Sequence, residues 1–290
     1  MSPRRLAARC PPRREYRQRI RLTLTYRTAM LIGALSTSGS GVMAASTYLD
    51  TAGNNIANSN TTGYKTQTIA FQDLFYTGLA PGTATSQNTR SPTGAQIGSG
   101  VNVSSIGGLF TQGTLAQTGR QFDLAISGQG FFPVSLGSGQ TGYTRAGNFT
   151  TNANGQLVSS DGFLLGNGSI KVPSNASAVT VSGDGTVTAT TPAGQQVLGT
   201  LTLTQFTNPE GLTRIGDTTF VAGPDSGAPV TGAPGTGGLG TITQGSLEQS
   251  NVDLPTELVN LIIAQSSFDY NTNALQVENE TLQATVALIP

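Results

Sequence analysis

The residue types that carry most enzyme chemistry are scarce in this 290-residue chain, which has no histidine and only one cysteine, Cys10. Because histidine is the commonest general base and metal ligand, zinc sites, Ser-His-Asp triads and Cys-His dyads are excluded. Carboxylates remain, and Asp161 with Asp184 would be the acid pair of a glycosidase. Each precedes a glycine in a turn dipeptide, where aspartate is favoured for backbone reasons. We therefore expect no enzyme, with no catalytic residue, no metal and no cofactor.

A glycine pattern that resembles a dinucleotide-binding loop occurs once, at residues 235–240 (GTGGLG). Such a pattern binds a pyrophosphate only where it joins a strand to a helix. Here it lies within residues 222–241, a stretch rich in glycine and proline that is typical of a loop or linker. We interpret the match as accidental.

The net charge of zero conceals two different parts of the chain. Residues 1–29 hold nine arginines and one acid, Glu15, which leaves six basic and fourteen acidic residues for the rest. From Ile215 to the end there is no lysine or arginine. A nucleic-acid-binding protein needs a basic face on its folded part, so nucleic acid is not an expected partner.

The basic leader, residues 1–29, lacks the apolar core of a secretory signal. Met30 follows where this composition stops, so we expect the leader to be disordered or a mis-assigned start, with translation beginning at Met30. No stretch reaches the ~18 apolar residues that a membrane-spanning helix needs. We expect no membrane insertion.

The segment after the leader, residues 30–65, predicts a helix with a repeating apolar face. Large residues recur at sevens, and a small residue follows each of them by three. The large positions are Leu35, Val42, Leu49 and Ile56, and the small ones are Ser38, Ala45, Ala52 and Ser59. Such a repeat is typical of a coiled-coil seam, but Gly33, Gly39, Gly41 and Gly53 weaken the helix by up to ~1 kcal/mol each. This helix needs a partner.

Residues 251–290 predict that partner, a long helix that begins at Asp253-Leu254-Pro255 and contains no later glycine or proline before Pro290. Its large residues also recur at sevens: Leu254, Leu261, Phe268, Leu275, Leu282 and Ile289. A second stripe, four residues on, is mixed: Leu258, Gln265, Thr272, Asn279 and Val286. All charges of this helix are acidic, so we expect apolar fit and amide hydrogen bonds to hold the seam.

Residues 66–250 predict strands and turns. Leu201, Leu203 and Gln205 alternate with threonines, and Asn154-Gly155, Asp161-Gly162 and Asp184-Gly185 signal hairpins. The expected fold class is therefore α+β. The N- and C-terminal helices pair as a coiled coil around a mainly antiparallel β domain, with the Gly/Pro loop at residues 222–241.

Residues 54–65 (NNIANSNTTGYK) resemble the signature of flagellar rod and hook proteins, the axial components of the bacterial flagellum. Asn54, Asn55 and Asn58 are expected to cap the helix end, Gly63 to permit a turn, and Tyr64 with Lys65 to lead into an extended segment. Residues 122–132, 143–149 and 244–253 are similar to further motifs of the family, in the family's order. Residues 71–76, 96–101 and 208–212 are most similar to segments of the distal rod proteins. Where the family usually has Arg and Lys in the C-terminal helix, this chain has Ser266 and Asn273.

The resemblance implies a structural subunit that polymerises into the distal rod of the basal body and transmits torque from motor to hook across the periplasm. It implies a homopolymer whose partners are neighbouring rod and hook proteins, the outer-membrane and peptidoglycan ring proteins, and the flagellar type III export apparatus, which exports it without a cleaved signal. The heptad residues Leu35, Val42, Leu49, Ile56, Leu254, Leu261, Phe268, Leu275 and Leu282 are the expected subunit interface.

Three other functions stay open at the level of the sequence. The chain could be a hook or proximal rod subunit, which differs in the proteins that surround it. A secreted β-rich adhesin or a phage-tail-like structural protein would act without the terminal helices. A glycan-cleaving enzyme would depend on Asp161 or Asp184.

Overall fold

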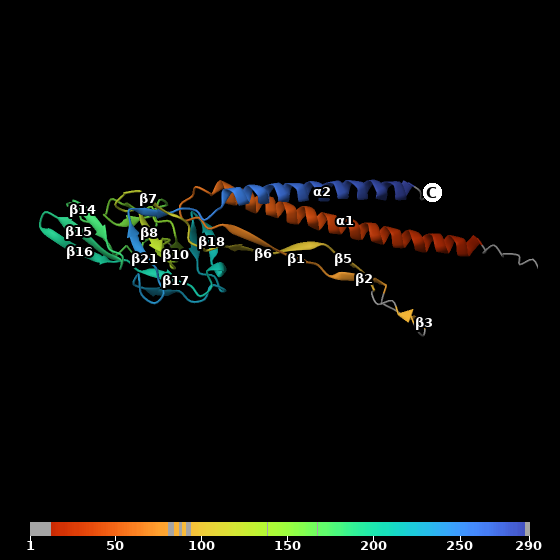
Figure 1. The fold of residues 1–290 in the computed structure, drawn as a ribbon, viewed down its shortest axis with the longest axis horizontal. Helices are drawn as coiled ribbons and strands as arrows, with labels where there is room; N and C mark the ends of the chain where they lie inside the picture. Colours follow the sequence, from red (N-terminus) through yellow and green to blue (C-terminus); the bar gives the residue numbers. More distant parts are fainter. Residues whose placement is uncertain are drawn as a thin grey trace, which may run out of the picture. The chain divides into compact units, whose positions relative to one another are not determined.

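A computed structural model describes residues 13–80, 84–86, 89–90, 94–137, 139–166 and 168–287. The leader before residue 13 and the seam position Ile289 lie outside them. The fold is α+β, with two long terminal helices in contact and an antiparallel β region between them in the chain (Figure 1). The described residues form two compact units. We call residues 13–49, 71–104 and 262–287 the helical unit, and residues 50–70 and 105–261 the β unit.

Helix α1 (Arg13–Ala57) is longer than the sequence indicated, because it begins inside the basic leader rather than near Met30. Residues 13–29 contain no glycine and no proline, and they are rich in arginine and leucine, which are good helix formers. The expectation of a leader separate from the helix overlooked this propensity. Helix α2 (Leu254–Ala287) starts at the expected Asp253-Leu254-Pro255 sequence.

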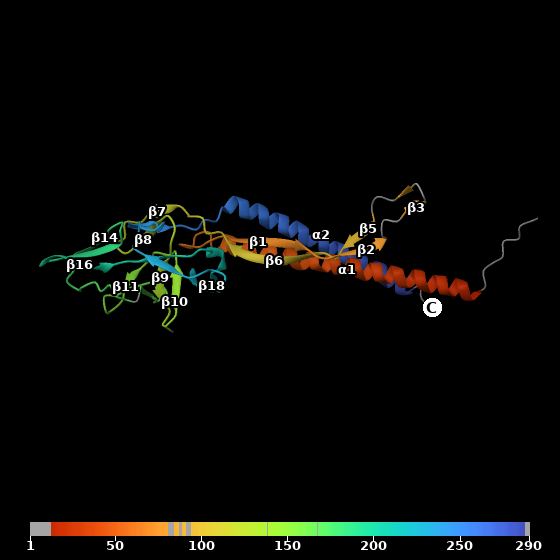
Figure 2. The same cartoon turned by 90° about the horizontal axis from the view of Figure 1, so that it is seen from below.

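In the helical unit the two helices meet through a polar contact and a close approach. The buried Ser38 hydroxyl donates a hydrogen bond of 3.1 Å to Glu278 Oε1. A Cβ on Gly41 would lie 2.8 Å from Asn271 Cγ, so a larger residue there would require the Asn271 side chain to move. The two views of Figures 1 and 2 show α1 in orange-red beside α2 in blue.

The residues of α2 that face α1 lie three positions after the large heptad residues. The sequence predicted them four positions after. Ala264 is fully buried and Asn271 and Glu278 are half-buried, whereas Leu258 and Val286 are exposed by 45% and 60%. The predicted second stripe was therefore wrong for the single chain. The physical reason is the contact with α1, whose Ser38 and Gly41 leave room for the polar Glu278 and Asn271.

The helical unit also contains a narrow β ribbon. Strand β2 (Tyr76–Ala80) pairs antiparallel with β5 (Ala95–Gly98), and β3 (Ala84–Ser86) pairs with β4 (Thr89–Arg90). Strands β1 (Gln67–Asp73) and β6 (Val101–Gly108) pair with each other and connect the ribbon to the rest of the chain.

The β unit is built on a seven-stranded sheet with the order β11-β12-β13-β9-β10-β19-β18, whose pairs are all antiparallel. A second sheet has the order β14-β15-β16, and β17 pairs with β20, β21 with β8, and β22 with β7. The bounds of these elements are β7 (Leu115–Gln117), β8 (Leu124–Ser127), β9 (Phe132–Ser135), β10 (Thr141–Thr144), β11 (Thr150–Thr151), β12 (Leu157–Val158), β13 (Leu164–Leu165), β14 (Ala178–Val181), β15 (Thr186–Thr191), β16 (Gly194–Thr200), β17 (Leu203–Gln205), the 3-10 helix η1 (Pro209–Gly211), β18 (Thr213–Gly216), β19 (Thr219–Val221), β20 (Val230–Gly232), β21 (Thr241–Gln244) and β22 (Ser246–Glu248).

Two apolar clusters form the core of this unit. The larger includes Leu124, Ile126, Phe132, Phe149 and Leu203, each at most 1% exposed. The smaller is aromatic: Phe131, Tyr143, Phe206 and Phe220, with rings meeting edge to face.

The three predicted hairpin turns all connect antiparallel strands. Asn154-Gly155 lies between β11 and β12, Asp161-Gly162 between β12 and β13, and Asp184-Gly185 between β14 and β15. Each glycine has a φ between 74° and 87°, which an L-residue rarely adopts.

The Gly/Pro stretch at residues 222–241 is not a free linker, contrary to the sequence interpretation. Within it, β20 pairs with β17 in a three-residue register, and Leu239 and Pro234 are buried. The pairing was invisible in the sequence because Val230-Thr231-Gly232 is too short to show alternation.

Candidate assembly junction

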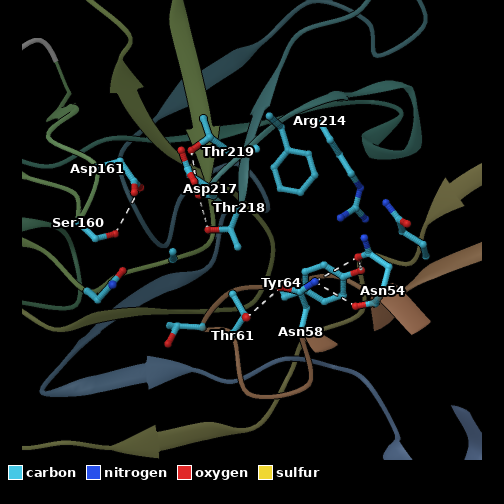
Figure 3. Close-up of a pocket in the computed structure, with 16 residues that line it drawn as sticks. Asn54, Asn58, Thr61, Tyr64, Ser160, Asp161, Arg214, Asp217, Thr218 and Thr219 are labelled. Carbon is cyan, nitrogen blue, oxygen red and sulfur yellow. Dashed lines mark hydrogen bonds between the residues drawn. The ribbon is translucent and has the colours of Figure 1, made fainter. Parts of the chain in front are cut away.

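The signature residues 54–65 end helix α1 and turn the chain toward β1, and all of them belong to the β unit. At the helix end, Asn58 Nδ2 donates hydrogen bonds to the Asn54 backbone oxygen (3.0 Å) and to Asn54 Oδ1 (3.1 Å). The Tyr64 hydroxyl donates to the same Asn54 Oδ1 at 2.9 Å (Figure 3). Asn58 is thus a capping residue, as expected, and Asn54 holds Tyr64 over the helix end.

Asn55 has a different role from the helix cap that the sequence suggested. Its side chain is 1% exposed, and it accepts from the Gln67 N–H and donates to the Gln67 carbonyl, at 2.9 and 2.8 Å. Its Nδ2 also donates to Glu257 Oε1 at 3.2 Å, and its Oδ1 accepts from the Tyr64 hydroxyl. One amide therefore ties the end of α1 to the first residue of β1 and to the first turn of α2.

Gly63 permits the turn that carries the chain onto the β unit. Its φ is 69°, and a Cβ there would lie 2.4 Å from the Ala146 backbone nitrogen. Its N–H donates to the Glu248 carbonyl at 2.8 Å. Both the backbone angle and the close approach demand glycine.

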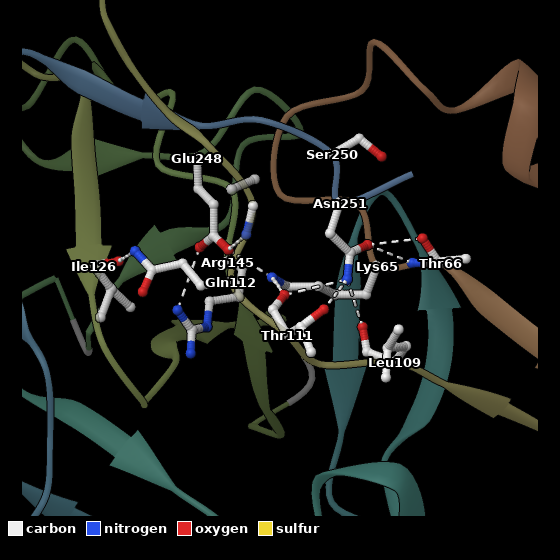
Figure 4. Close-up of polar contacts among 12 residues, drawn as sticks. Lys65, Thr66, Leu109, Thr111, Gln112, Ile126, Arg145, Glu248, Ser250 and Asn251 are labelled. Carbon is white, nitrogen blue, oxygen red and sulfur yellow. Dashed lines mark hydrogen bonds and ion pairs between the residues drawn. The ribbon is translucent and has the colours of Figure 1, made fainter. Parts of the chain in front are cut away.

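Lys65 ends the signature in a buried ionic network. Lys65 and Glu248 are fully buried, and the ammonium donates to Glu248 Oε1 and, at 2.7 Å, to the Thr111 carbonyl. Arg145 Nη1 lies 3.2 Å from Glu248 Oε2, and the Gly113 N–H donates to Oε1 at 2.9 Å. Figure 4 shows the two cations converging on this one carboxylate. Glu248 thus joins β22 to the signature and to the segment after β10.

Burial and the Glu248 carboxylate act in opposite directions on the pKa values of these two cations. Desolvation lowers the pKa of Lys65, and the Glu248 carboxylate opposes that shift by favouring the charged ammonium. Desolvation also lowers the pKa of Arg145. Because a direct carboxylate partner favours the charged forms, we interpret both side chains as cations at neutral pH.

Asn251 connects the same region to the start of α2. Its Oδ1 accepts from the Thr66 N–H and hydroxyl, at 2.8 and 2.9 Å. Its Nδ2 donates to the Leu109 carbonyl and to Thr111 (Figure 4). The segment that enters α2 is therefore hydrogen-bonded to the segment that leaves α1.

Arg214 covers the signature tyrosine from β18. Its Nη2 donates to the Lys65 carbonyl at 2.8 Å, and its guanidinium lies 5.5 Å from the Tyr64 ring centre and 5.2 Å from that of Phe220. Burial raises the pKa of Tyr64 above its ordinary value, although the Arg214 charge opposes this.

A polar cavity of about 470 Å³ lies beside Tyr64 and Arg214, and Asn54, Asn58 and Asp161 also line it (Figure 3). Asp184, the other carboxylate considered for catalysis, is not among its lining residues. Hydrogen bonds from the Thr186 N–H and hydroxyl lower the pKa of Asp184, so it suits its turn rather than the role of a general acid. The geometry does not bring the two aspartates together at this cavity.

The nine heptad positions differ in exposure within the single chain. Leu254 is 41% exposed, and the other eight are half-buried. Of the two departures from the family pattern, Ser266 is half-buried and Asn273 is exposed.

The described residues contain neither a membrane-spanning helix nor a metal-binding cluster. In those ranges no helix is long and apolar enough to cross a membrane. The same ranges contain no cluster of three or more residues of the metal-binding types.

Sequence reasoning missed Glu248, Arg145, Asn251 and Arg214 as partners of the signature. Three of them, Arg145, Glu248 and Asn251, lie inside motifs that the sequence did single out, at residues 143–149 and 244–253. What no motif shows is which residues meet, because Glu248 is 183 positions from Lys65 and 103 from Arg145.

Comparison with known proteins agrees with these motifs. Family models match residues 35–65 (flagella basal body rod protein), 125–189 (flagellar hook protein FlgE/F/G D1 domain) and 243–288 (flagellar basal body rod FlgEFG protein C-terminal). The flagellar basal-body rod protein FlgG of Caulobacter vibrioides is 42% identical over 260 residues, which cover 88% of this chain and 98% of the relative. That of Agrobacterium fabrum is 41% identical, with 85% and 95% covered. The flagellar hook protein FlgE of Escherichia coli is 40% identical over 132 residues, 46% of this chain and 29% of the hook protein.

Proposed function

This chain belongs to the family of the flagellar basal-body rod protein FlgG, and from that premise we propose that it polymerises through its terminal helices into the distal rod. The family is structural rather than enzymatic, and a distal rod subunit is the function that the motifs predicted. In the proposed polymer, copies of the chain repeat by a heterologous contact that does not close, which produces an open helical filament.

The observation that carries the proposal is the junction itself. Within the β unit, Asn55 binds Glu257, and Asn251 binds Thr66, so the end of α1 and the start of α2 are fixed to one another. Lys65 and Arg145 then fix this junction to the β region through Glu248. A subunit that passes torque needs the segment that leaves α1 and the segment that enters α2 to be fixed to each other in this way.

The rod is favoured over the hook by the extent of the similarity. The match to the Caulobacter rod protein covers 98% of that relative, whereas the match to the E. coli hook protein covers 29% of the hook protein. We propose that the chain is exported by the flagellum's own type III apparatus. Its proposed contacts are neighbouring rod and hook proteins and the ring proteins around the rod.

Electron microscopy of basal bodies from a strain that lacks residues 30–290 tests the place in the flagellum. We expect a rod that stops short, with the outer rings and the hook missing. A complete rod without a hook would assign the chain to the hook, and intact flagella would contradict the proposal. A proximal position would instead leave almost no rod.

The heptad residues are the proposed means of assembly, and a charge on α2 tests them. In the full chain, Leu261→Glu or Phe268→Glu should abolish polymerisation, measured by sedimentation, while the β region stays folded by circular dichroism. Gln265→Glu places the same charge on an exposed position of the same helix and should leave polymerisation intact. Filaments from either of the first two variants would show that these residues do not carry assembly.

A further inference from the structure

The polar cavity beside Tyr64 has no role in the proposed polymer. All of its lining residues belong to the β unit, and its volume of about 470 Å³ is typical of small-molecule sites, which span about 300–1,000 Å³. Most of these residues are polar, and they come mainly from the end of α1, the turn between β12 and β13, and the hairpin of β18 and β19 (Figure 3). Such a wall suits a ligand rich in hydrogen-bonding groups better than an apolar one.

Several side chains on the wall of this cavity have polar groups that no described residue satisfies. The side-chain amides of Gln67 and Asn148 make no hydrogen bond within the described ranges, and neither does the carboxylate of Asp217. The Arg214 guanidinium makes one, from Nη2 to the Lys65 carbonyl. None of these groups is among the unpartnered polar atoms that the protein encloses completely, so a ligand can reach them. The cavity therefore offers unused donors and unused acceptors.

The hairpin between β18 and β19 contributes to the cavity wall in a strained conformation. Its two loop residues, Asp217 and Thr218, have φ angles of 50° and 54°, and among the described residues they alone have a positive φ without being glycine. A positive φ is rare for a β-branched residue, and two-residue hairpin loops of this type usually have glycine in the position of Thr218. Strained residues of this kind cluster at binding sites. Here both of them line the cavity.

Charge and aromatic burial narrow the class of ligand. The carboxylates of Asp161 and Asp217 and the guanidinium of Arg214 line the cavity, and this balance disfavours a phosphate or another anion. The rings of Tyr64 and Phe220 are buried, and Arg214 lies over both, so neither offers a face on which an aromatic ligand could stack. A compact ligand whose hydroxyl groups both donate and accept hydrogen bonds fits these groups best.

We propose that this cavity is a saccharide-binding site. The Asp217 carboxylate accepts hydrogen bonds from neighbouring hydroxyls of a sugar ring, because it has two acceptor oxygens. The amides of Gln67 and Asn148 and the free N–H groups of Arg214 donate to the ring and hydroxyl oxygens. All of these residues belong to the β unit, so the site does not depend on polymerisation.

Saturation-transfer NMR of the full, unassembled chain tests the site with two trisaccharides. Maltotriose carries only hydroxyl groups, whereas the β-1,4-linked trimer of N-acetylglucosamine also carries acetamido groups. We expect magnetisation transfer to at least one of them, and the transfer should saturate as the concentration of the trisaccharide rises. No transfer to either one would overturn the proposal. Because the chain is not assembled in this measurement, the result is independent of whether it forms a polymer.

Variants on the cavity wall show whether the saccharide lies there. Asp217→Asn, which tolerates the positive φ, and Asn148→Ala should each weaken binding at least fivefold. Thr218→Gly should raise the midpoint of urea unfolding and weaken binding, because the turn loses its strain and the cavity loses a wall residue.

Asp225→Asn is the matched control, because it removes the same charge at an exposed position that does not line the cavity. It should leave binding unchanged. Circular dichroism checks the fold of each variant, and Asp217→Asn decides if Asn148→Ala does not fold, because Asp217 is exposed. Binding that Asp217→Asn and Thr218→Gly both leave unchanged would place the saccharide elsewhere and overturn the site.

Discussion

Glu248 is a single buried carboxylate that neutralises part of the charge of two cations, Lys65 and Arg145. Burying an ion costs several kcal/mol unless it is paired and hydrogen-bonded. Here the Gly113 N–H and the Thr111 carbonyl supply further hydrogen bonds. Each oxygen of the buried Glu248 carboxylate is therefore paired with one of the two cations.

Lys65→Met should destabilise the β unit by about 2 kcal/mol, because Glu248 Oε1 loses a charged hydrogen-bond donor, although Arg145 still balances the charge of Glu248. The free energy of unfolding in urea measures this. Lys171→Met, at an exposed lysine, should change stability by less than about 0.5 kcal/mol. Equal effects of the two variants would show that the buried network adds nothing to stability.

The raised pKa of Tyr64 predicts that the folded chain becomes less stable in alkaline solution. Because burial raises its pKa in the folded state, its contribution is fully present below the unfolded pKa of about 10 and is lost as pH rises through the folded value. The phenolate would face two amide oxygens, those of Asn54 and Asn55. Urea unfolding between pH 8 and pH 11 should show a smaller alkaline loss for Tyr64→Phe than for the natural chain. Tyr76→Phe, at an exposed tyrosine, should retain the full loss.

At the scale of elements, the residues that α1 and α2 bury most deeply include several small ones. Ala45, Ala52 and Ala264 are at most 5% exposed, and Ser38 is 9% exposed. The larger partners, such as Val42 and Phe268, stay half-buried in the single chain. Helices of this kind gain most of their stability from packing rather than from propensity.

Alanine substitution should have different effects on stability at two glycines of α1. Gly39→Ala enters open space and should stabilise the helix by up to about 1 kcal/mol, because alanine is the best helix former. Gly41→Ala gains the same propensity but displaces the Asn271 side chain, which donates to the Ser267 carbonyl, so it should stabilise the chain less than Gly39→Ala does. Circular dichroism at 222 nm during thermal unfolding compares them. Similar shifts for both would contradict the close approach at Gly41.

At the scale of the whole molecule, the two apolar clusters lie in the β unit, between residues 122 and 242 for the larger one and between residues 110 and 220 for the smaller one. The helical unit has no comparable cluster in its described residues. Its helices therefore depend on each other and, in the proposed polymer, on further copies.

Removal of residues 262–290 should separate folding from assembly. The shortened chain keeps Glu257 for Asn55 and all of the Glu248 network, so its β unit should resist limited proteolysis as the full chain does. It should form no polymer in a sedimentation assay, because Phe268, Leu275 and Leu282 of the heptad repeat are gone. A pellet from this chain would show that assembly does not need α2 beyond Leu261.

Local patterns in the sequence were enough for several features of this protein. The heptads predicted both terminal helices, the Asn-Gly and Asp-Gly pairs predicted three hairpins, and the signature at residues 54–65 predicted the family. These features depend on residues close together in the chain, where periodicity and turn chemistry act directly.

The tertiary structure decided what local patterns leave open. A heptad repeat does not show whether the second set of contacting residues lies three or four positions after the first. On α2, contact with Ser38 and Gly41 of α1 selected the set that contains Asn271 and Glu278. Nor does any local pattern join Lys65 to Glu248, because 183 residues separate them and only the folded chain brings the ammonium to the carboxylate. Such pairings arise from the packing of distant elements, where burial makes an unpaired charge too costly to leave alone.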